Sequence, residues 1–184
     1  MRRRRAIFLD RDGVINASPA QKGYITRWEE FRFLPGVLTA LKSLKETGRK
    51  AIVVSNQAGV GRGIYPASQL KEITHRMLRS IRAAGGQVDA VYYCTHTPEA
   101  GCRCRKPRAG MLRKAARRFS ISLEQSFVIG DNVTDIQMGK SARCRTVLVL
   151  TGVTGRNHLR RVTVKPDRVA RNLREAVRWI LRQP

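Results

Sequence analysis

The stretch AIFLDRDGVIN, residues 6–16, carries four apolar residues directly into Asp10 and Asp12. The apolar part, 6–9, has the continuous hydrophobic pattern of a strand that is buried on both faces. Two carboxylates so close together repel each other and lose hydration, so a bound cation or a reaction is the usual reason to keep them there. The stretch therefore predicts a buried strand that ends at a functional site.

Similar short runs recur along the chain and alternate with helical patterns. The predicted strands are residues 6–10, 50–55, 89–94, 126–130 and 145–150. Apolar residues at helical spacing predict helices over 37–44, 70–81, 111–119, 136–142 and 173–180. This alternation is typical of βαβ units, so we predict an α/β fold with an open, parallel, Rossmann-like sheet and helices on both faces. A length of 184 residues fits a single domain, 1–184, in which 152–169 is a basic loop.

The charge of the chain is strongly positive, with 37 Lys and Arg against 13 Asp and Glu and a formal net charge of +24. Such a chain attracts polyanions, which makes nucleic acid a possible partner. We do not favour it, because an aromatic content of 6% offers few stacking platforms and arginines on solvated helix faces explain the charge equally well. The apolar stretch after Met1–Arg5 is too short for a signal peptide, and no run is long enough to cross a membrane. We expect a cytoplasmic monomer with no membrane association.

Polar residues follow three of the predicted strands, and in open parallel sheets ligands bind at this edge. They are Asp10 and Asp12 after the first strand, Ser55, Asn56 and Gln57 after the second, and Asp131 after the fourth. Gathered together, three carboxylates need a counter-charge, and Mg²⁺ prefers such oxygen ligands together with substrate phosphate. A hydroxyl (Ser55) and an ammonium (Lys106) complete a set that suits a phosphoryl group.

Three of the four cysteines lie within one short segment that also contains a histidine. Cys94, His96, Cys102 and Cys104 have the composition of a closed, tetrahedral Cys3His zinc site. The alternatives are a disulfide, which a cytoplasmic chain disfavours, or unrelated buried thiols. We predict structural Zn²⁺ that stiffens this loop and helps to position Lys106.

These motifs together resemble the haloacid dehalogenase superfamily of phosphatases. Its pattern of D-x-D-G-[TV], then Ser or Thr, then Lys, then G-D-x-x-x-D is present in order at 10–14, Ser55, Lys106 and 130–135. The resemblance implies that Asp10 is a nucleophile and that Asp12 is the general acid and base. It also implies that Mg²⁺ is held by the carboxylate of Asp10, the backbone carbonyl of Asp12 and Asp131. Ser55 and Lys106 would steady the phosphoryl group, and Asp135 would orient Lys106 or a metal-bound water.

The zinc loop, with SNQAGVGRG at 55–63, is similar to a narrower group of this superfamily that acts on heptose bisphosphates or on histidinol phosphate. This implies a small phosphorylated sugar as substrate, in precursor synthesis for a surface polysaccharide, and a site shaped by 15–34 and the zinc loop without a large cap domain. Arg105 would contact a second phosphate or the sugar, and Asn56, Gln57 and Asn132 would line the pocket. Three alternatives stay open: a histidinol-phosphate phosphatase, a nucleic-acid 3′-phosphatase, and a nucleic-acid-binding module without activity.

Overall fold

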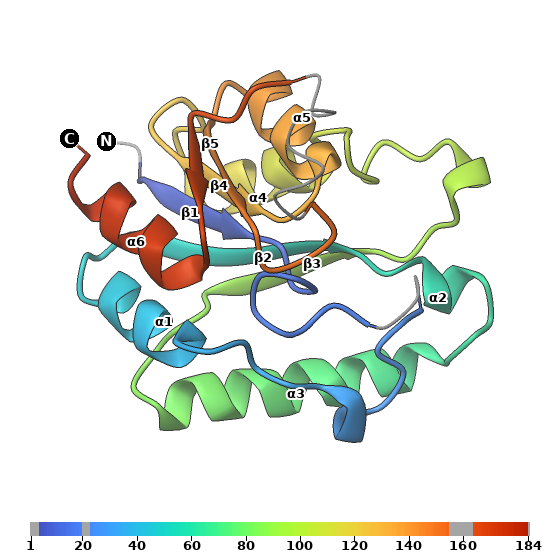
Figure 1. The fold of residues 1–184 in the computed structure, drawn as a ribbon. Coiled ribbons are helices and arrows are strands. Elements are labelled where there is room, and N and C mark those ends of the chain that lie inside the picture. The colour runs from blue at the N-terminus through green and yellow to red at the C-terminus, as the bar shows by residue number, and fades with distance from the viewer. Residues whose placement is uncertain (1–3, 20–22, 155–163, 184) are drawn as a thin grey trace.

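The computed structural model describes residues 4–19, 23–154 and 164–183, and its centre is one parallel sheet (Figure 1). The strands lie in the order β3-β2-β1-β4-β5-β6, and every neighbouring pair is parallel. They are β1 (Ala6–Leu9), β2 (Lys50–Asn56), β3 (Ala90–Cys94), β4 (Phe127–Gly130), β5 (Arg145–Val149) and β6 (Arg168–Ala170). This order, with its reversal beside β1, is that of a doubly wound fold. The predicted open parallel α/β sheet is confirmed.

Helices cover both faces of the sheet. They are α1 (Val37–Lys45), α2 (Ala58–Gly61), α3 (Ala67–Ala83), α4 (Gly110–Phe119), α5 (Val133–Ser141) and α6 (Leu173–Leu181), with short 3₁₀ turns η2 (Trp28–Glu30) and η3 (Pro98–Ala100). Apart from Leu70 of α3, the buried residues of α1, α3 and α6 belong to one hydrophobic cluster, and those of α4 belong to a second cluster across the sheet. Figure 1 shows α4 and α5 on the side of the sheet opposite α1, α3 and α6. Among the described residues, no helix is long and apolar enough to span a bilayer.

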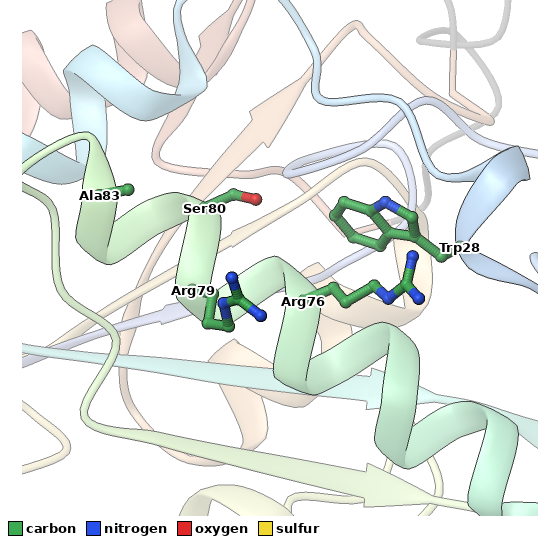
Figure 2. Close-up of a pocket in the computed structure, with 5 residues that line it drawn as sticks. All are labelled: Trp28, Arg76, Arg79, Ser80 and Ala83. Carbon is green, nitrogen blue, oxygen red and sulfur yellow. The ribbon is translucent and has the colours of Figure 1, made fainter.

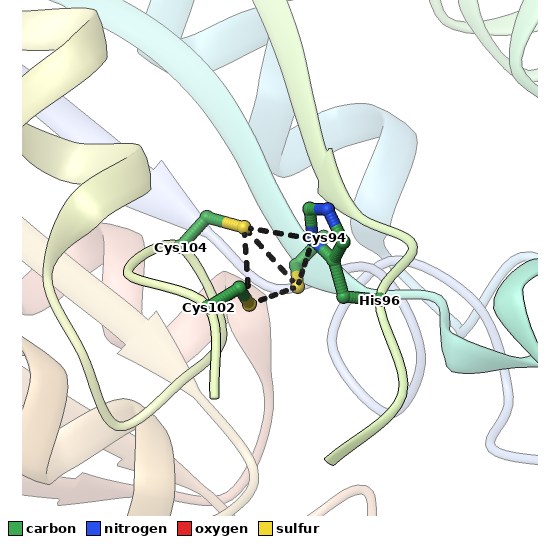
Figure 3. Close-up of side chains that lie close together, drawn as sticks. All are labelled: Cys94, His96, Cys102 and Cys104. Carbon is green, nitrogen blue, oxygen red and sulfur yellow. Dashed lines mark hydrogen bonds between the residues drawn. The ribbon is translucent and has the colours of Figure 1, made fainter. Parts of the chain in front are cut away.

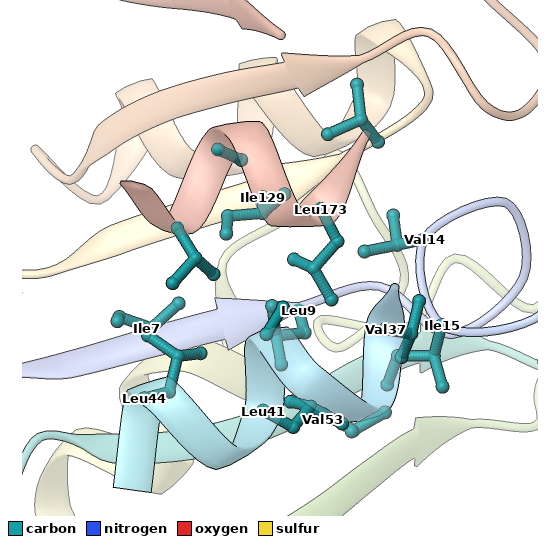
Figure 4. Packing of buried hydrophobic residues seen from close by; sticks show 14 of the residues in the cluster. Ile7, Leu9, Val14, Ile15, Val37, Leu41, Leu44, Val53, Ile129 and Leu173 are labelled. Atoms are coloured by element: carbon teal, nitrogen blue, oxygen red, sulfur yellow. The ribbon is translucent and has the colours of Figure 1, made fainter. Parts of the chain in front are cut away.

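The alternation of side chains along β1 explains why its sequence is apolar throughout. Ile7 and Leu9 pack into the cluster formed with α1, α3 and α6 (Figure 4), whereas Ala6 and Phe8 pack into the cluster on the α4 face. Successive residues of a strand point to opposite faces, so a central strand covered on both sides has no polar position. The first polar residue, Asp10, can appear only where the strand leaves the core.

The elements α2, η2, η3 and β6 were not predicted, and one predicted helix begins at a different residue. The three-residue strand β6 lies within the stretch 152–169 that was expected to be a loop, of which 155–163 lie outside the described residues. The helix expected over 136–142 begins earlier, at Val133, because the side chain of Asn132 caps it by accepting a hydrogen bond from the backbone N–H of Thr134. The other predicted strands and helices differ only by a few residues at their ends.

Register brings the ends of β1, β2 and β4 to one edge of the sheet. Leu9 is paired with Val53 of β2 and with Ile129 of β4. The chain continues this pairing for one more bond, in which the N–H of Asp10 donates to the carbonyl of Ile129 at 3.0 Å. The residues that follow these three strands therefore start from neighbouring points, and the described part of the chain forms no large cap domain over them.

Candidate functional site

Asp10 lies at the centre of the carboxyl edge, with one of its oxygens already occupied. Its Oδ1 accepts a hydrogen bond from the backbone N–H of Arg11 at 2.7 Å and lies 2.9 Å from Nζ of Lys106. The side chain is 14% exposed, so it still reaches the solvent-filled pocket. These contacts fix the direction of the carboxylate and leave Oδ2 as the oxygen that can face a ligand.

Lys106 connects Asp10 with a second carboxylate, Asp135. Its Nζ lies 2.6 Å from Oδ1 of Asp135, and both side chains are almost fully buried. Burial on its own lowers the pKa of a lysine, but the negative charges of Asp10 and Asp135 outweigh it and raise the pKa of Lys106. Lys106 is therefore a permanently charged ammonium at the floor of the site. The expectation that Asp135 orients Lys106 agrees with this ion pair.

Asp131 completes a group of three converging carboxylates. Single oxygens of Asp10, Asp131 and Asp135 all lie within 4.8 Å of one another. The Oδ2 of Asp131 accepts a hydrogen bond from the N–H of Val153 at 2.7 Å. Burial, followed by the charges of Asp10 and Asp135, raises the pKa of Asp131 to about 8. Three acids beside one lysine leave excess negative charge, and an oxygen-liganded divalent cation such as Mg²⁺ fits this donor set.

The space around Asp131 depends on two glycines. A Cβ atom at Gly13 would collide with the carboxylate of Asp131, and the same holds for Gly152. Gly13 also has a φ of +81°, which side-chain-bearing residues rarely adopt. Loops that follow β1 and β5 thus approach Asp131 more closely than any residue with a side chain would allow.

Asp12 lines the pocket, and its carboxylate also accepts hydrogen bonds from side chains that do not line the pocket. Its Oδ1 accepts hydrogen bonds from Arg11 and from Asn16 Nδ2, and its Oδ2 accepts one from Gln57 Nε2 at 2.8 Å. Its side chain is 23% exposed. The side chain of Arg11 was not singled out by the sequence, because it is one arginine among 28 and nothing in its spacing marks it as buried.

The three residues at the end of β2 have different positions. Ser55 lines the pocket with its hydroxyl close to Gln57 Nε2 (3.2 Å). Asn56 also lines the pocket, and its Oδ1 accepts a hydrogen bond from the backbone N–H of Lys106 at 3.2 Å, which braces the lysine. Gln57 differs from the expectation: it is buried behind Asp12 and does not line the pocket, because its side chain is needed there as a hydrogen-bond partner.

Two further predicted contacts lie at the margins. Asn132 lines the pocket, although its Oδ1 is engaged at the start of α5. Arg105 does not line this pocket. Its NH1 lies 3.4 Å from the carbonyl of His96, and it faces a neighbouring hollow beside the zinc-loop residues Cys102 and Arg108. A direct contact between Arg105 and a ligand at Asp10 would need the side chain to turn from the loop toward the pocket.

The pocket itself has a volume of about 260 Å³ and opens at the carboxyl edge of the sheet. It is lined by Asp10, Asp12, Ser18, Pro19, Gly23, Tyr24, Ser55, Asn56, Lys106, Asp131, Asn132, Thr134 and Val153. Residues 15–34 were expected to shape the site, and Ser18 and Tyr24 of this range line the pocket, although 20–22 lie outside the described residues. Thr134 and Val153 were not foreseen, since each becomes a pocket residue only through the turn in which it lies.

The four predicted zinc ligands come together at the end of β3 (Figure 3). The Sγ atoms of Cys94, Cys102 and Cys104 lie 3.3 to 3.5 Å apart, and Nδ1 of His96 lies 3.3 Å from Sγ of Cys104. A disulfide needs about 2.05 Å between sulfurs, whereas four ligands at about 2.3 Å from one tetrahedral ion lie just under 4 Å apart. The cluster therefore has the composition and spacing of a zinc site.

A second hollow lies between η2 and α3, away from these groups (Figure 2). It is lined by Trp28, Arg76, Arg79, Ser80 and Ala83. Arg76 is engaged with the carboxylates of Glu72 and Glu29, and none of the predicted site residues faces the hollow. The chemistry therefore belongs to the carboxyl edge of the sheet.

Comparisons with known proteins agree with this geometry. Residues 103–176 match the model of the HAD-hydrolase-like family. The chain is 36% identical to a D-glycero-beta-D-manno-heptose-1,7-bisphosphate 7-phosphatase of Helicobacter pylori, over 96% of this chain and 97% of the relative. It is 41% identical to the enzyme of that name from Photorhabdus laumondii, over 80% and 81%. The chain belongs to the haloacid dehalogenase-like hydrolases.

Solved structures place this hydrolase among the same relatives. The crystal structure of D,D-heptose 1,7-bisphosphate phosphatase from B. bronchiseptica, complexed with magnesium and phosphate, superposes with a TM-score of 0.91 at 34% identity, covering 98% of this chain and 99% of that chain. The corresponding phosphatase from Burkholderia thailandensis gives a TM-score of 0.74 at 31% identity, covering 98% and 100%. The superfamily and enzyme class predicted from the sequence are confirmed: the chain is a phosphoric monoester hydrolase.

Proposed function

We propose that this hydrolase removes the 7-phosphate of D-glycero-β-D-manno-heptose 1,7-bisphosphate, in nucleotide-heptose synthesis for a surface polysaccharide. The observation that carries the proposal is end-to-end similarity to a relative named for this reaction, in a chain whose Asp10, Lys106 and Asp131 converge on one pocket. A place in the cytoplasm and a monomeric state stay predictions, and nucleic acid stays a partner that the sequence allows but does not favour.

The contacts of Asp10 and Asp12 support a two-step displacement. In the first step an oxygen of Asp10 bonds to phosphorus while the ester P–O bond breaks, and the leaving oxygen takes a proton from Asp12. In the second step Asp12 takes a proton from a water as the water oxygen bonds to phosphorus. The bond between Asp10 and phosphorus then breaks, which releases inorganic phosphate, restores the carboxylate of Asp10 and leaves Asp12 protonated as it was at the start. Lys106, held between Asp10 and Asp135, stabilises the negative charge on the transferring group.

The cation site follows from the same residues. Asp10 and Asp131 would hold Mg²⁺ with the backbone carbonyl of Asp12, and Asp135 stays paired with Lys106. When bound, the ion offsets the charge of the carboxylates and of the phosphoryl oxygens. The crystal structure of the B. bronchiseptica relative in complex with magnesium and phosphate supports this assignment.

Zn²⁺ would occupy the cluster of Cys94, His96, Cys102 and Cys104 and leave no open position for water. Its role here is structural. Cys104 precedes Lys106 by two residues, and the backbone of Lys106 is fixed on its other side by Asn56. The zinc loop and the end of β2 together would then hold the lysine at the pocket.

A substrate panel tests the proposal. Phosphate release is measured from the heptose bisphosphate, from histidinol phosphate and from 3′-phosphorylated DNA, each with and without Mg²⁺. We expect the highest kcat/KM for the heptose bisphosphate, with turnover that requires Mg²⁺. The Asp10→Asn variant is the control for the chemistry, and it should fold normally and release no phosphate from any ester.

The outcomes separate the substrate from the mechanism. Preference for histidinol phosphate or for 3′-phosphorylated DNA would overturn the heptose assignment but retain the phosphatase site. Full activity of Asp10→Asn would overturn the nucleophile.

A further inference from the structure

Arg11 is the residue between the two aspartates of the motif, and its side chain is completely buried. It is 0% exposed, and it is the largest of the fully buried side chains in the described part of the chain. Removing a guanidinium from water is costly unless its charge is paired and its N–H groups are bonded. An arginine on the surface would serve solubility, but this one stands beneath the site.

The guanidinium is directed at the carboxylate of Asp12. Its Nε and NH2 lie 3.1 and 3.0 Å from Oδ1, and NH2 lies 3.0 Å from Oδ2. The planar fork of arginine thus contacts both oxygens of the acid, which fixes the plane of the carboxylate as well as its distance. The other face of Arg11 lies 5.8 Å from the ring centre of Tyr93, within range of a cation–π contact.

Gln57 and Tyr65 extend this support. Oε1 of Gln57 accepts hydrogen bonds from the hydroxyl of Tyr65 at 2.8 Å and from NH2 of Arg11 at 3.2 Å. With Oε1 occupied by two donors, the amide can present only Nε2 to Asp12, which it does at 2.8 Å. Tyr65, Gln57 and Arg11 therefore form a connected set in which both Arg11 and Gln57 donate hydrogen bonds to Asp12.

We propose that Arg11 is a positioning residue that holds Asp12 where it exchanges a proton with the leaving oxygen, and that Gln57 and Tyr65 assist it. The proposal rests on the role given to Asp12 under the proposed function. Arg11 touches neither phosphorus nor the leaving group in this account. It acts through the orientation of the acid, and a residue that merely filled the core would affect all substrates alike.

The leaving group provides the test. An alkyl phosphate, such as the heptose 7-phosphate or histidinol phosphate, expels a basic alkoxide that needs a proton as the bond breaks. The p-nitrophenolate of p-nitrophenyl phosphate is weakly basic and departs without one. The parameter kcat/KM includes only the steps up to departure of the leaving group, so the later use of Asp12 toward water does not enter it. Loss of proton transfer must therefore lower kcat/KM for the alkyl ester selectively.

The variants are Arg11→Met, Arg11→Lys and Tyr65→Phe, with Arg113→Met as a control that removes an exposed arginine. For Arg11→Met we expect kcat/KM on the better alkyl ester to fall by about tenfold to a hundredfold, within the range of general acid catalysis, and on p-nitrophenyl phosphate by less than about threefold. Arg11→Lys keeps the charge without the fork and should recover part of the loss. Tyr65→Phe should show a smaller loss with the same selectivity, and Arg113→Met none.

Asp12→Asn separates this proposal from the one on which it rests. If Asp12→Asn lowers kcat/KM equally on both kinds of ester, the assignment of Asp12 as the acid is wrong. A different outcome is that Asp12→Asn lowers kcat/KM more for the alkyl ester than for p-nitrophenyl phosphate while Arg11→Lys and Tyr65→Phe lower both equally. In that case Arg11 is only a structural residue and the proposal is overturned. Circular dichroism and binding of orthovanadate show whether each variant is folded with its pocket intact. If Arg11→Met does not fold, Arg11→Lys and Tyr65→Phe decide the question.

Discussion

The charged residues at the pocket differ in the groups that neutralise them. Lys106 lies between Asp10 and Asp135, whereas Asp131 is held by a backbone N–H. Burial beside the charges of Asp10 and Asp135 raises the pKa of Asp131, so this carboxyl resists ionisation until a cation arrives. This division leaves Asp131 as the side chain most dependent on a metal ion, so small changes around it should be felt first in metal binding.

Gly152 offers a direct way to perturb Asp131. In the variant Gly152→Ala, the added Cβ would collide with the carboxylate of Asp131 and force it to move. We expect the Mg²⁺ concentration for half-maximal activity to rise by about tenfold, which corresponds to about 1.4 kcal/mol. Gly48→Ala is the control for destabilisation alone, because a Cβ there meets nothing within 4 Å although the φ of +66° strains the substitution. An unchanged Mg²⁺ requirement in Gly152→Ala would show that Asp131 is not a ligand.

The sequence predicted which side chains of the site gather but not which way each one faces. Asp10, Asp131 and Lys106 follow from motif order and from the common edge of parallel strands. Gln57 was placed at the pocket, whereas the structure turns it behind Asp12. That difference depends on Arg11 and Tyr65, whose burial is a property of three-dimensional packing and leaves no local pattern in the chain.

Among the elements, the loop between β3 and α4 has little hydrophobic core of its own, and its cysteines and histidine replace one. We expect about one zinc ion per chain, and a lower Tm with less phosphatase activity after removal of zinc by a chelator. Binding energy from a structural metal is folding energy for such a loop. The measurement is metal analysis combined with thermal unfolding.

Two cysteine variants provide the matched comparison. Cys102→Ser removes a ligand and should lose zinc, whereas Cys144→Ser changes a buried thiol outside the cluster and should retain it. If the protein prepared without chelator contains no zinc and melts at the same temperature with and without chelator, the zinc assignment fails.

The short strand β6 is attached through Asp167. Its Oδ2 accepts hydrogen bonds from the N–H and the hydroxyl of Thr146, and its Oδ1 lies 2.7 Å from Nζ of Lys140. Three residues are too few for a recognisable strand pattern, which is why β6 was not predicted. The contacts of Asp167 hold this short strand beside β5. We expect Asp167→Ala to destabilise the protein by about 1–3 kcal/mol, since it leaves the buried N–H of Thr146 without an acceptor.

The pH dependence of this effect has a definite sign. Although burial opposes ionisation, the hydrogen bonds from Lys140 and Thr146 outweigh it and hold the pKa of Asp167 below 3.8. A carboxyl with a lowered folded-state pKa contributes stability above its unfolded pKa and loses it as pH falls through the folded value. The difference in unfolding free energy between the protein and Asp167→Ala should be constant near neutral pH and narrow below 3.8. A difference that widened on acidification would contradict the assignment.

For the molecule as a whole, the net charge of +24 should act on encounter with substrate. A positive field concentrates anions, and salt screens it over about 10 Å at 0.1 M. We expect kcat/KM for the bisphosphate to fall severalfold when ionic strength rises from about 0.01 to 0.2 M, with little change in kcat. The singly phosphorylated p-nitrophenyl phosphate should respond less, because it carries less charge. Equal salt dependence for the two esters would show that the charge plays no part in substrate capture.

The architecture could largely be predicted from the sequence, because the patterns that indicate strands and helices are local. Five apolar runs, the helical stripes between them and the known handedness of βαβ units leave few ways to arrange a parallel sheet. The placement of Arg105 beside the zinc loop was not accessible, since it depends on how the loop folds back over itself. Local patterns thus determine the architecture, and contacts between distant segments determine the orientation of the side chains at the site.

The four-residue strand β1 has a consequence for how this chain can change over generations. Every one of its residues belongs to a hydrophobic cluster, alternately on one face and the other. Loss or gain of a single residue before Asp10 would shift the phase of the pleat, exchange the two sets and carry the carboxylate of Asp10 out of reach of Lys106. Substitutions can accumulate here, but insertions and deletions must fall elsewhere, for example in the connection over 15–34. The number of residues that pack into the core before Asp10 thus fixes where its carboxylate lies.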